Sequence, residues 1–440
     1  MSFSNYLKWE WISFTRSTHK IIAVFLFLIA AGFAIRNGYA LREKQLATLQ
    51  KVETEAKVMR ESALEWIKND QKGPEDRAWV NVQTPFYAMW YANHHVNKTP
   101  SPLMVYTIGQ AEQFGFYKRV NVWSTAYDSD LAAEISNPER IALGALDFTF
   151  VILFLLPLLL IVLCFTVGGY EQDKLVFKLI RIQLGTQSPW IFGRIVSIGI
   201  FISLLLIVVI LSAALATGIL NQSGSSLFLF IGVVLAYLWF WLFLIIGIIH
   251  LQLGQTSQAM ALTMVWVIFA LAIPGAVHQA ASIKYPNNLM VDFLDAKREE
   301  PEVIYAKEFG EIWSLVAQKI PELKSSKLGN QPDSLLNPMV KGGLYRTEMS
   351  FHMAEVSEKV EKGFDEKNAF IKKSYWFNPI LGVQNYLFKL AETDYVSYQN
   401  YRKEIQHSNL KLCKSLILEE WNEEKIDVER FQKYEALLKK

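Results

Sequence analysis

The most constraining feature of this chain is a run of 89 consecutive residues, Ile195 to Ile283, that contains no Asp, Glu, Lys or Arg. About a quarter of the residues in an ordinary soluble domain are charged, so a run of this length excludes a simple soluble enzyme. The formal net charge is only +2 and no long basic run occurs, which argues against a protein that binds nucleic acid. The sequence therefore predicts an integral membrane protein.

Five segments are long and apolar enough to cross a bilayer, because a hydrocarbon core of about 30 Å needs about 20 helical residues. Peptide groups find no water in lipid, so these segments must be helical. The predicted spans are Ile21 to Ala40, Ile141 to Gly169, Ile195 to Leu220, Leu227 to Leu251 and Thr256 to Ala280. Short polar turns, predicted at residues 221–226 and 254–257, join the last three into one antiparallel unit, residues 195–280.

The orientation follows from the Lys and Arg residues of the short loops, which are enriched on the cytoplasmic side. Residues 1–20 and the loop 170–194 hold these basic residues: Lys8, Arg16, Lys20, Lys174, Lys178, Arg181 and Arg194. Both segments are therefore predicted to be cytoplasmic, and residues 41–140 and 281–440 to be extracytoplasmic. Residues 1–20, which are rich in aromatic residues and which we call the leader, are expected to form an interfacial helix. For the first span, a secretory signal peptide is the alternative, but 20 residues are long for the charged n-region that opens such a peptide.

The two outer regions have different patterns. Residues 41–70 lack Gly and Pro and repeat apolar residues at helical spacing, which predicts a rigid continuation of the first span, residues 21–40. The rest of the first region is mixed, which predicts a small irregular or α+β fold. The second region is predicted to be mostly helical, with a helix start at Thr393-Asp394 and an amphipathic helix from Tyr395 to the end. The predicted fold class is thus mainly α, a polytopic membrane helical bundle with two large extracytoplasmic regions.

The sequence predicts no catalytic residue, cofactor or metal in this chain. The dipeptide Gly-Lys does not occur, which excludes a phosphate-binding loop of the form GxxxxGK[ST], and no GxSxG is present. The pair His94-His95 has no Cys or further His nearby, so a solvated or interface pair is a better interpretation than a metal site. His250 and His278 lie at ends of predicted spans, where headgroup anchoring is expected.

Two polar features carry functional hypotheses. Asp147 lies near the outer end of the second span and is a candidate for span packing or gating; alternatively it reaches water or bonds to a neighbouring helix. In the loop 171–190, basic residues share one helical face and apolar residues another. An interfacial helix on anionic lipid is the simple interpretation. The sharper one is a coupling helix that docks on an ATPase, with these contact residues: Glu171, Lys174, Phe177, Lys178 and Arg181.

Three stretches follow the order seen in one known family. They are PSPL and IGQ followed by EISNPERIALGALDFTFVILFLLPLLL, then GYEQDK, and finally NPILGVQNYLFKLAETDYVSYQNYRKEI at residues 378–405. With these motifs the chain resembles permease subunits of ABC transporters of the type-2 exporter class, in the branch with two large extracytoplasmic insertions. It departs from the family in two places. Lys174-Leu175-Val176 stands where relatives have Gly-Thr-Leu, and only five of the usual six spans are found.

The resemblance implies a multi-pass protein of the bacterial inner membrane that couples ATP hydrolysis by a partner to export or to mechanical work on the envelope. Its implied partners are an ATP-binding cassette subunit carrying ATP and magnesium, a second permease subunit in a homo- or heterodimer, membrane lipid and a periplasmic protein. Two alternatives stay open. One is a membrane-anchored scaffold without transport. The other is a membrane-embedded hydrolase, for which the spans offer only Asp147 and Arg36 as charged groups.

Overall fold

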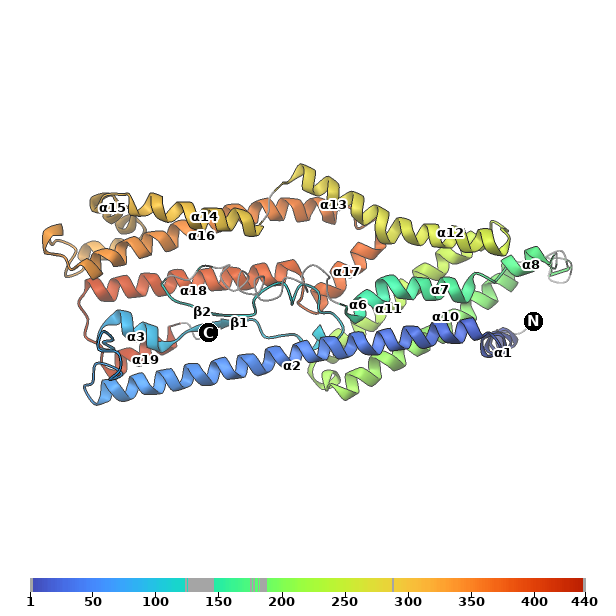
Figure 1. Ribbon diagram of the computed structural model, residues 1–440, viewed down its shortest axis with the longest axis horizontal. Coiled ribbons are helices and arrows are strands. Elements are labelled where there is room, and N and C mark those ends of the chain that lie inside the picture. Colours follow the sequence, from blue (N-terminus) through green and yellow to red (C-terminus); the bar gives the residue numbers. More distant parts are fainter. Residues whose placement is uncertain are drawn as a thin grey trace.

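The computed structural model describes residues 3–122, 125, 146–174, 176, 179–180, 182, 188–286 and 289–437. The molecule is elongated and mainly helical (Figure 1). Apolar helices gather at one end of the long axis and polar helices at the other. We call these the apolar half and the polar half.

One helix connects the two halves. α2 (Thr18–Lys68) has 51 residues, about 77 Å at 1.5 Å per residue. Residues 41–68 continue the first span without a break, which confirms the rigid extension that the absence of Gly and Pro predicts. α1 (Phe3–Thr15) precedes α2 and lies at the free end of the apolar half (Figure 1). We call this end, which carries α1, the leader end.

The described part of the chain has five helical segments long and apolar enough to cross a membrane, which confirms the predicted number. They are Thr18–Lys68 (α2), Phe148–Asp173 (α6 Phe148–Phe150, η2 Val151–Leu155, α7 Leu156–Cys164 and α8 Gly169–Asp173), Ser188–Ala216 (α10), Ile219–Ile249 (α11), and Gln255–Lys284 (α12 Gln255–Val267, η3 Ile268–Ala272 and α13 Ile273–Lys284). The second span is the most buried of the five and the fifth is the least buried. Residues 141–145, predicted to open the second span, lie outside the described residues.

The turn between the third and fourth spans corrects the sequence prediction. The chain reverses at Thr217 and Gly218, where Gly218 adopts a left-handed conformation with a φ of 71°, and α11 begins at once. The polar residues 221–226 therefore belong to α11, with a kink at Ser223, rather than to a turn. Arg42 of α2 donates a hydrogen bond of 2.9 Å to Oε1 of Gln222, so these polar first turns pack against the connecting helix.

Two spans contain a π turn just before a proline. η2 precedes Pro157 and η3 precedes Pro274. The proline ring does not fit the preceding turn of a regular α-helix, and the wider π turn makes room for it. Pro157 has no N–H to offer the carbonyl of Leu153, four residues earlier. Tyr237 of α11 donates its hydroxyl to that carbonyl at 2.7 Å instead. Neighbouring helices thus satisfy backbone groups that lipid could not.

The polar half contains the small mixed region and the later helices. Strand β1 (His95–Asn97) pairs antiparallel with β2 (Tyr117–Arg119), with Val96 opposite Lys118, so the first region has helix and a minimal sheet. The other elements are α3 (Pro85–Ala92), η1 (Pro102–Val105), α14 (Leu289–Tyr305), α15 (Phe309–Lys319), η4 (Pro321–Ser325), η5 (Asp333–Leu335), α16 (Pro338–Lys372), α17 (Pro379–Leu390), α18 (Tyr395–Trp421) and α19 (Val428–Ala436).

The C-terminal segment differs from the single amphipathic helix that the sequence predicts. Asp394 caps α18 by accepting from the backbone N–H of Val396 at 3.3 Å, which confirms the predicted start. The helix ends at Trp421, however, and α19 starts anew after its own cap, Asp427. α18 runs between α16 and the mixed region, so it is buried on several sides rather than along one stripe.

Candidate functional site

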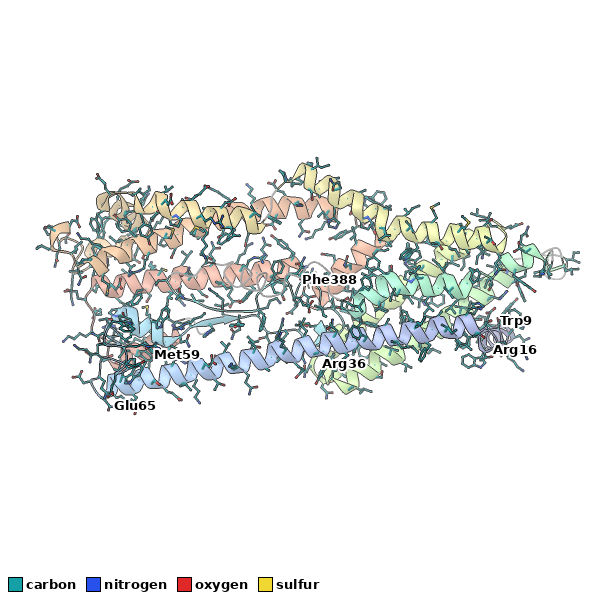
Figure 2. The ribbon with its side chains drawn as sticks, in the orientation of Figure 1. Trp9, Arg16, Arg36, Met59, Glu65 and Phe388 are labelled. Carbon is teal, nitrogen blue, oxygen red and sulfur yellow. The ribbon has the colours of Figure 1, made fainter. Side chains whose placement is uncertain are left out.

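Four segments that are far apart in the sequence meet at the leader end. They are α1, α8 with the loop that follows the second span, the start of α10, and the start of α12 (Figure 1). Trp9 and Arg16 mark this end in Figure 2. The sequence predicts the first two of these segments to be the ones that face the cytoplasm, so this junction is the first candidate for a functional site.

A buried arginine holds the junction together. The guanidinium of Arg194, on α10, donates from Nε to Oε1 of Glu10 on α1 and from Nη1 to Oε1 of Glu171 on α8. All three side chains are less than 10% exposed. Buried charges are stable only when they are paired and hydrogen-bonded. The pairing therefore fixes α1 and α8 to the start of the third span.

Aromatic rings enclose this arginine. The guanidinium carbon lies 4.5 Å from the centroid of the Trp9 ring and 5.6 Å from that of Trp190, within the range of cation–π attraction. At the residue just before Arg194, a Cβ on Gly193 would come within 2.8 Å of the Tyr6 ring, so only glycine lets α1 approach α10 this closely. The leader helix thus packs into the fold instead of lying free on it.

Lys20 completes the charge balance. It begins the first span, is 3% exposed and interacts electrostatically with Glu10, Glu171 and Arg194. We call Glu10, Lys20, Glu171 and Arg194 the Arg194 cluster. With two acids and two bases, the cluster has no net formal charge and can be buried at a membrane boundary.

α8 and the end of the second span are held on their other side as well. Oε2 of Glu171 accepts from the backbone N–H of Gly168 at 2.9 Å, which caps α8. Asp173 accepts from the backbone N–H of Gln255 at 3.0 Å, which joins α8 to the start of α12. The buried Gln258 donates to the carbonyls of Phe165 at 3.0 Å and Val167 at 2.8 Å, at the end of the second span.

A cavity of about 710 Å³ adjoins the Arg194 cluster, between α1, α10 and the loop after the second span. Its walls include Trp9, Tyr170, Glu171 and Trp190. The cavity and the exposed side chains of Tyr170 and Lys174 give this junction an accessible surface, which lies over the buried Arg194 cluster. This surface cannot move relative to the helices beneath it without separating buried charges.

The predicted ATPase-contact residues fall into three groups. Glu171 is buried and both of its oxygens are bound within this chain, so the geometry gives it a positioning role rather than direct contact with a partner. Lys174 is exposed next to it. Phe177, Lys178 and Arg181 lie outside the described residues.

Asp147 caps the second span. Its Oδ1 accepts from the backbone N–H of Phe150 at 2.7 Å, and its Oδ2 accepts from those of Ile108 at 2.9 Å and Gly109 at 3.3 Å. The side chain is buried, so it does not reach water. This contact packs the span against the loop that follows η1; a role in gating stays a prediction.

Sequence reasoning did not find Glu10, nor the part that Arg194 plays in this site. A signal for both was present: Glu10 is the one acid in the aromatic leader, and Arg194 is the last charge before the uncharged run. An isolated charge beside apolar segments needs a partner. Which residue would supply that partner depended on α1 folding back onto α10.

The histidine pair offers no sign of a metal site. His94 is buried and His95 is half-buried, with Nδ1 of His95 lying 3.3 Å from the carbonyl of Asn93. Burial lowers the pKa of His95. Among the described residues no group of three or more His, Cys, Asp or Glu side chains is placed to hold a metal ion.

Comparison with known proteins adds one match. Residues 318–436 match a family described as a domain of unknown function, DUF3526. This segment runs from the end of α15 through α19 and lies in the polar half. No curated protein and no solved structure matches the chain. The five apolar helices and their arrangement thus define the class on their own: a multi-pass, mainly helical membrane protein.

Proposed function

We propose that this chain is the non-catalytic permease subunit of an ATP-driven transporter of the ABC class in a bacterial inner membrane. In this proposal the N-terminus and the leader end face the cytoplasm, and the polar half projects outside. A partner ATPase hydrolyses ATP, and the chain converts that cycle into export or into mechanical work on the envelope.

The Arg194 cluster is the observation that carries the proposal. A device that transmits force needs its receiving surface tied firmly to the helices that move. Arg194 ties the leader helix α1 through Glu10, and α8 through Glu171, to the third span. Asp173 and Gln258 extend the same connection to the fifth span. A push on this surface would therefore act on several spans together.

The continuous helix α2 supports the second half of the proposal. It carries the first span and continues to Lys68 without a break, so a tilt at the leader end would displace the polar half. The weakly buried fifth span leaves an apolar face, including Met260, Met264 and Leu271, that a second permease subunit or lipid would cover.

The test is purification from gently solubilised membranes, with mass spectrometry of the co-purified proteins and an assay of ATP hydrolysis. We expect an ATP-binding cassette protein in the complex. Reversing two predicted contact charges, Lys178→Glu with Arg181→Glu, should abolish its co-purification. The matched control reverses two exposed lysines of the polar half, Lys51→Glu with Lys57→Glu, and should leave it unchanged.

One result would count against the proposal, and another would change only its contact surface. Recovery of envelope proteins alone, without ATP hydrolysis, would favour a membrane-anchored scaffold. Unchanged co-purification in the Lys178→Glu, Arg181→Glu variant would remove the predicted contact surface while leaving the permease assignment in place.

A further inference from the structure

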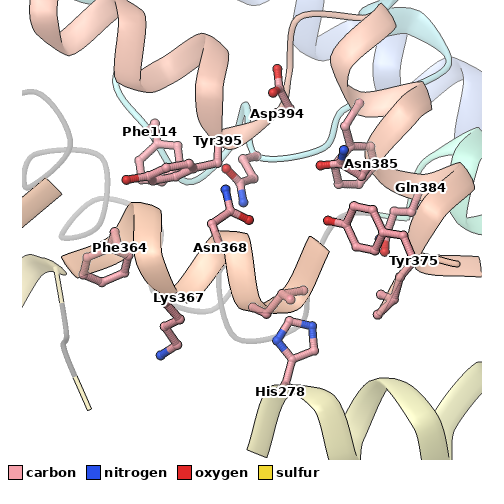
Figure 3. Close-up of a pocket in the computed structure, with 14 residues that line it drawn as sticks. Phe114, His278, Phe364, Lys367, Asn368, Tyr375, Gln384, Asn385, Asp394 and Tyr395 are labelled. Atoms are coloured by element: carbon pink, nitrogen blue, oxygen red, sulfur yellow. The ribbon is translucent and has the colours of Figure 1, made fainter. Parts of the chain in front are cut away.

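A second cavity, of about 520 Å³, lies where the polar half meets the spans. It is bounded by α16, α17, the start of α18 and the loop after η1, with His278 of α13 at its edge (Figure 3). α17 packs against α11 and the two π turns, η2 and η3, so the floor of the cavity is joined directly to three spans. The cavity thus lies at the junction between the polar half and the spans.

Carboxamides dominate the polar lining of this cavity. Gln110, Asn368, Gln384 and Asn385 all contribute to its wall, and Figure 3 shows the amides of Asn368 and Asn385 directed into the same space. Each carboxamide offers donors and an acceptor in one planar group. Hydroxyl groups do the same, so a set of neighbouring hydroxyls can form bonds to both ends of each amide.

One of these amides is left incomplete by the protein. Oε1 of Gln110 is buried and accepts no hydrogen bond from the described residues. The backbone holds Gln110 in place, because its N–H donates to the carbonyl of Thr393 at 3.0 Å and Gly109 adopts a left-handed φ of 53° beside Thr393. A buried acceptor without a donor is costly. A ligand hydroxyl would supply the missing donor.

Aromatic rings form the apolar part of the wall. Phe364 and Tyr395 stack with their centroids 6.5 Å apart, and Phe114 and Phe388 also line the cavity. Flat aromatic faces next to carboxamides suit a ligand with one apolar face and a hydroxylated edge. This mixture of apolar walls and a few polar groups is typical of small-molecule sites.

The cavity carries little free charge. The carboxylate of Asp394 is occupied as a helix cap by the N–H of Val396 and the hydroxyl of Ser397. In Figure 3 the Lys367 side chain extends away from Asn368 and Asn385. Among the described residues that line the cavity, Lys367 is the only lysine or arginine, so these residues form no cluster of cations of the kind that binds phosphate. The lining therefore favours an uncharged ligand.

We propose that this cavity binds the uncharged, polyhydroxylated headgroup of a sugar-type amphiphile. The amphiphile would lie at the membrane surface from which the polar half projects. The sugar would lie against the aromatic rings and bond to the four carboxamides, while an attached tail would leave past the end of α13 into the lipid. The proposal does not depend on ATPase coupling, since binding here needs only this chain.

The experiment uses the full chain in phosphatidylcholine nanodiscs, with saturation-transfer NMR to detect the sugar protons of dodecyl-β-maltoside. We expect a signal from the wild type and a loss of affinity of about tenfold or more in Asn368→Leu with Asn385→Leu, because two hydrogen-bonding groups are removed. Asn400→Leu, at an exposed position on α18, is the matched control and should bind like the wild type. Leu381→Trp fills the cavity without removing an amide, and should also abolish binding.

A comparison of two ligands, free maltose and dodecyl-β-maltoside, identifies the source of the sugar. Binding of free maltose as tight as that of the maltoside indicates a soluble sugar, whereas binding of the maltoside alone indicates a lipid-borne one. The proposal is overturned if neither binds the wild type, or if the Asn368→Leu, Asn385→Leu and Leu381→Trp variants bind as the wild type does. It is also overturned if the wild type prefers phosphatidylglycerol and Lys367→Gln removes that preference.

Discussion

Two arginines of this protein are each held by two carboxylates, and they have very different surroundings. Arg194, in the apolar half, pairs with Glu10 and Glu171 and has a side chain that is 4% exposed. Arg430, on α19 in the polar half, pairs with Glu419 at 3.0 Å and Glu424 at 2.8 Å and is 32% exposed. Each cluster pairs one guanidinium with two carboxylates. The clusters differ in how deeply they are buried and in how far apart their members lie in the sequence.

That difference shows what a buried ion network does in a membrane protein. Both partners of Arg430 lie within eleven residues of it, so that cluster only links two consecutive helices. Glu10 lies 184 residues before Arg194, and both side chains are almost inaccessible to solvent. The exposed cluster contributes little to stability, whereas the buried one decides which segments meet at the leader end.

Replacing each arginine with methionine tests this comparison most strongly. Arg194→Met leaves Glu10 and Glu171 buried without their partner, and we expect a loss of about 3–5 kcal/mol in the free energy of unfolding. Arg430→Met should cost about 1 kcal/mol or less. Thermal unfolding of both variants in the same detergent measures the contrast. Equal losses would show that the Arg194 cluster is not buried in the way described.

A second prediction concerns pH in the polar half. Burial raises the pKa of Glu420 to about 7, although Arg346, 3.6 Å away, acts in the opposite direction. Because its pKa is raised on folding, Glu420 favours the folded state below the unfolded pKa of about 4.5, and this contribution is lost as pH rises through about 7. Relative to the wild type, Glu420→Gln should therefore gain about 2–3 kcal/mol of stability between pH 4.5 and pH 8. A pH-independent difference between the two unfolding curves would refute this prediction.

The cap of the second span is expected to give the next largest effect. Asp147→Ala removes the acceptor for three backbone N–H groups, those of Ile108, Gly109 and Phe150. We expect a loss of about 2 kcal/mol, since the cap and the neighbouring loop are both affected. Thr48→Ala, which removes an exposed hydroxyl of α2, serves as the control. A loss no larger than that of the control would remove Asp147 from the packing of the span.

The smallest expected effect is that of Tyr237→Phe in the apolar half. The variant keeps the ring and loses only the hydrogen bond to the carbonyl of Leu153, which Pro157 leaves without its helical partner. We expect a loss of about 1 kcal/mol in unfolding free energy. Faster hydrogen exchange of the backbone around the π turn η2 would accompany it. Unchanged exchange and stability would mean that the freed carbonyl has another partner.

Sequence patterns predicted much of this architecture because each relevant signal is local. The uncharged run Ile195 to Ile283 predicted three of the spans, and the absence of Gly and Pro after the first span predicted the long extension of α2. Periodicity was less informative near the ends of elements. It placed the turn after the third span several residues too late and missed the break between α18 and α19, because both depend on capping and packing.

The sequence by itself determined that this chain enters a membrane, since apolar length and missing charge fix that outcome whatever the partners. Only the tertiary structure decided which charged residues serve as its internal anchors. Glu10, Glu171 and Arg194 come together because α1 folds against α10 while α8 closes the other side, and no spacing in the chain records that meeting. The same holds for the amides of Gln110, Asn368 and Asn385, which three separate segments bring to one cavity.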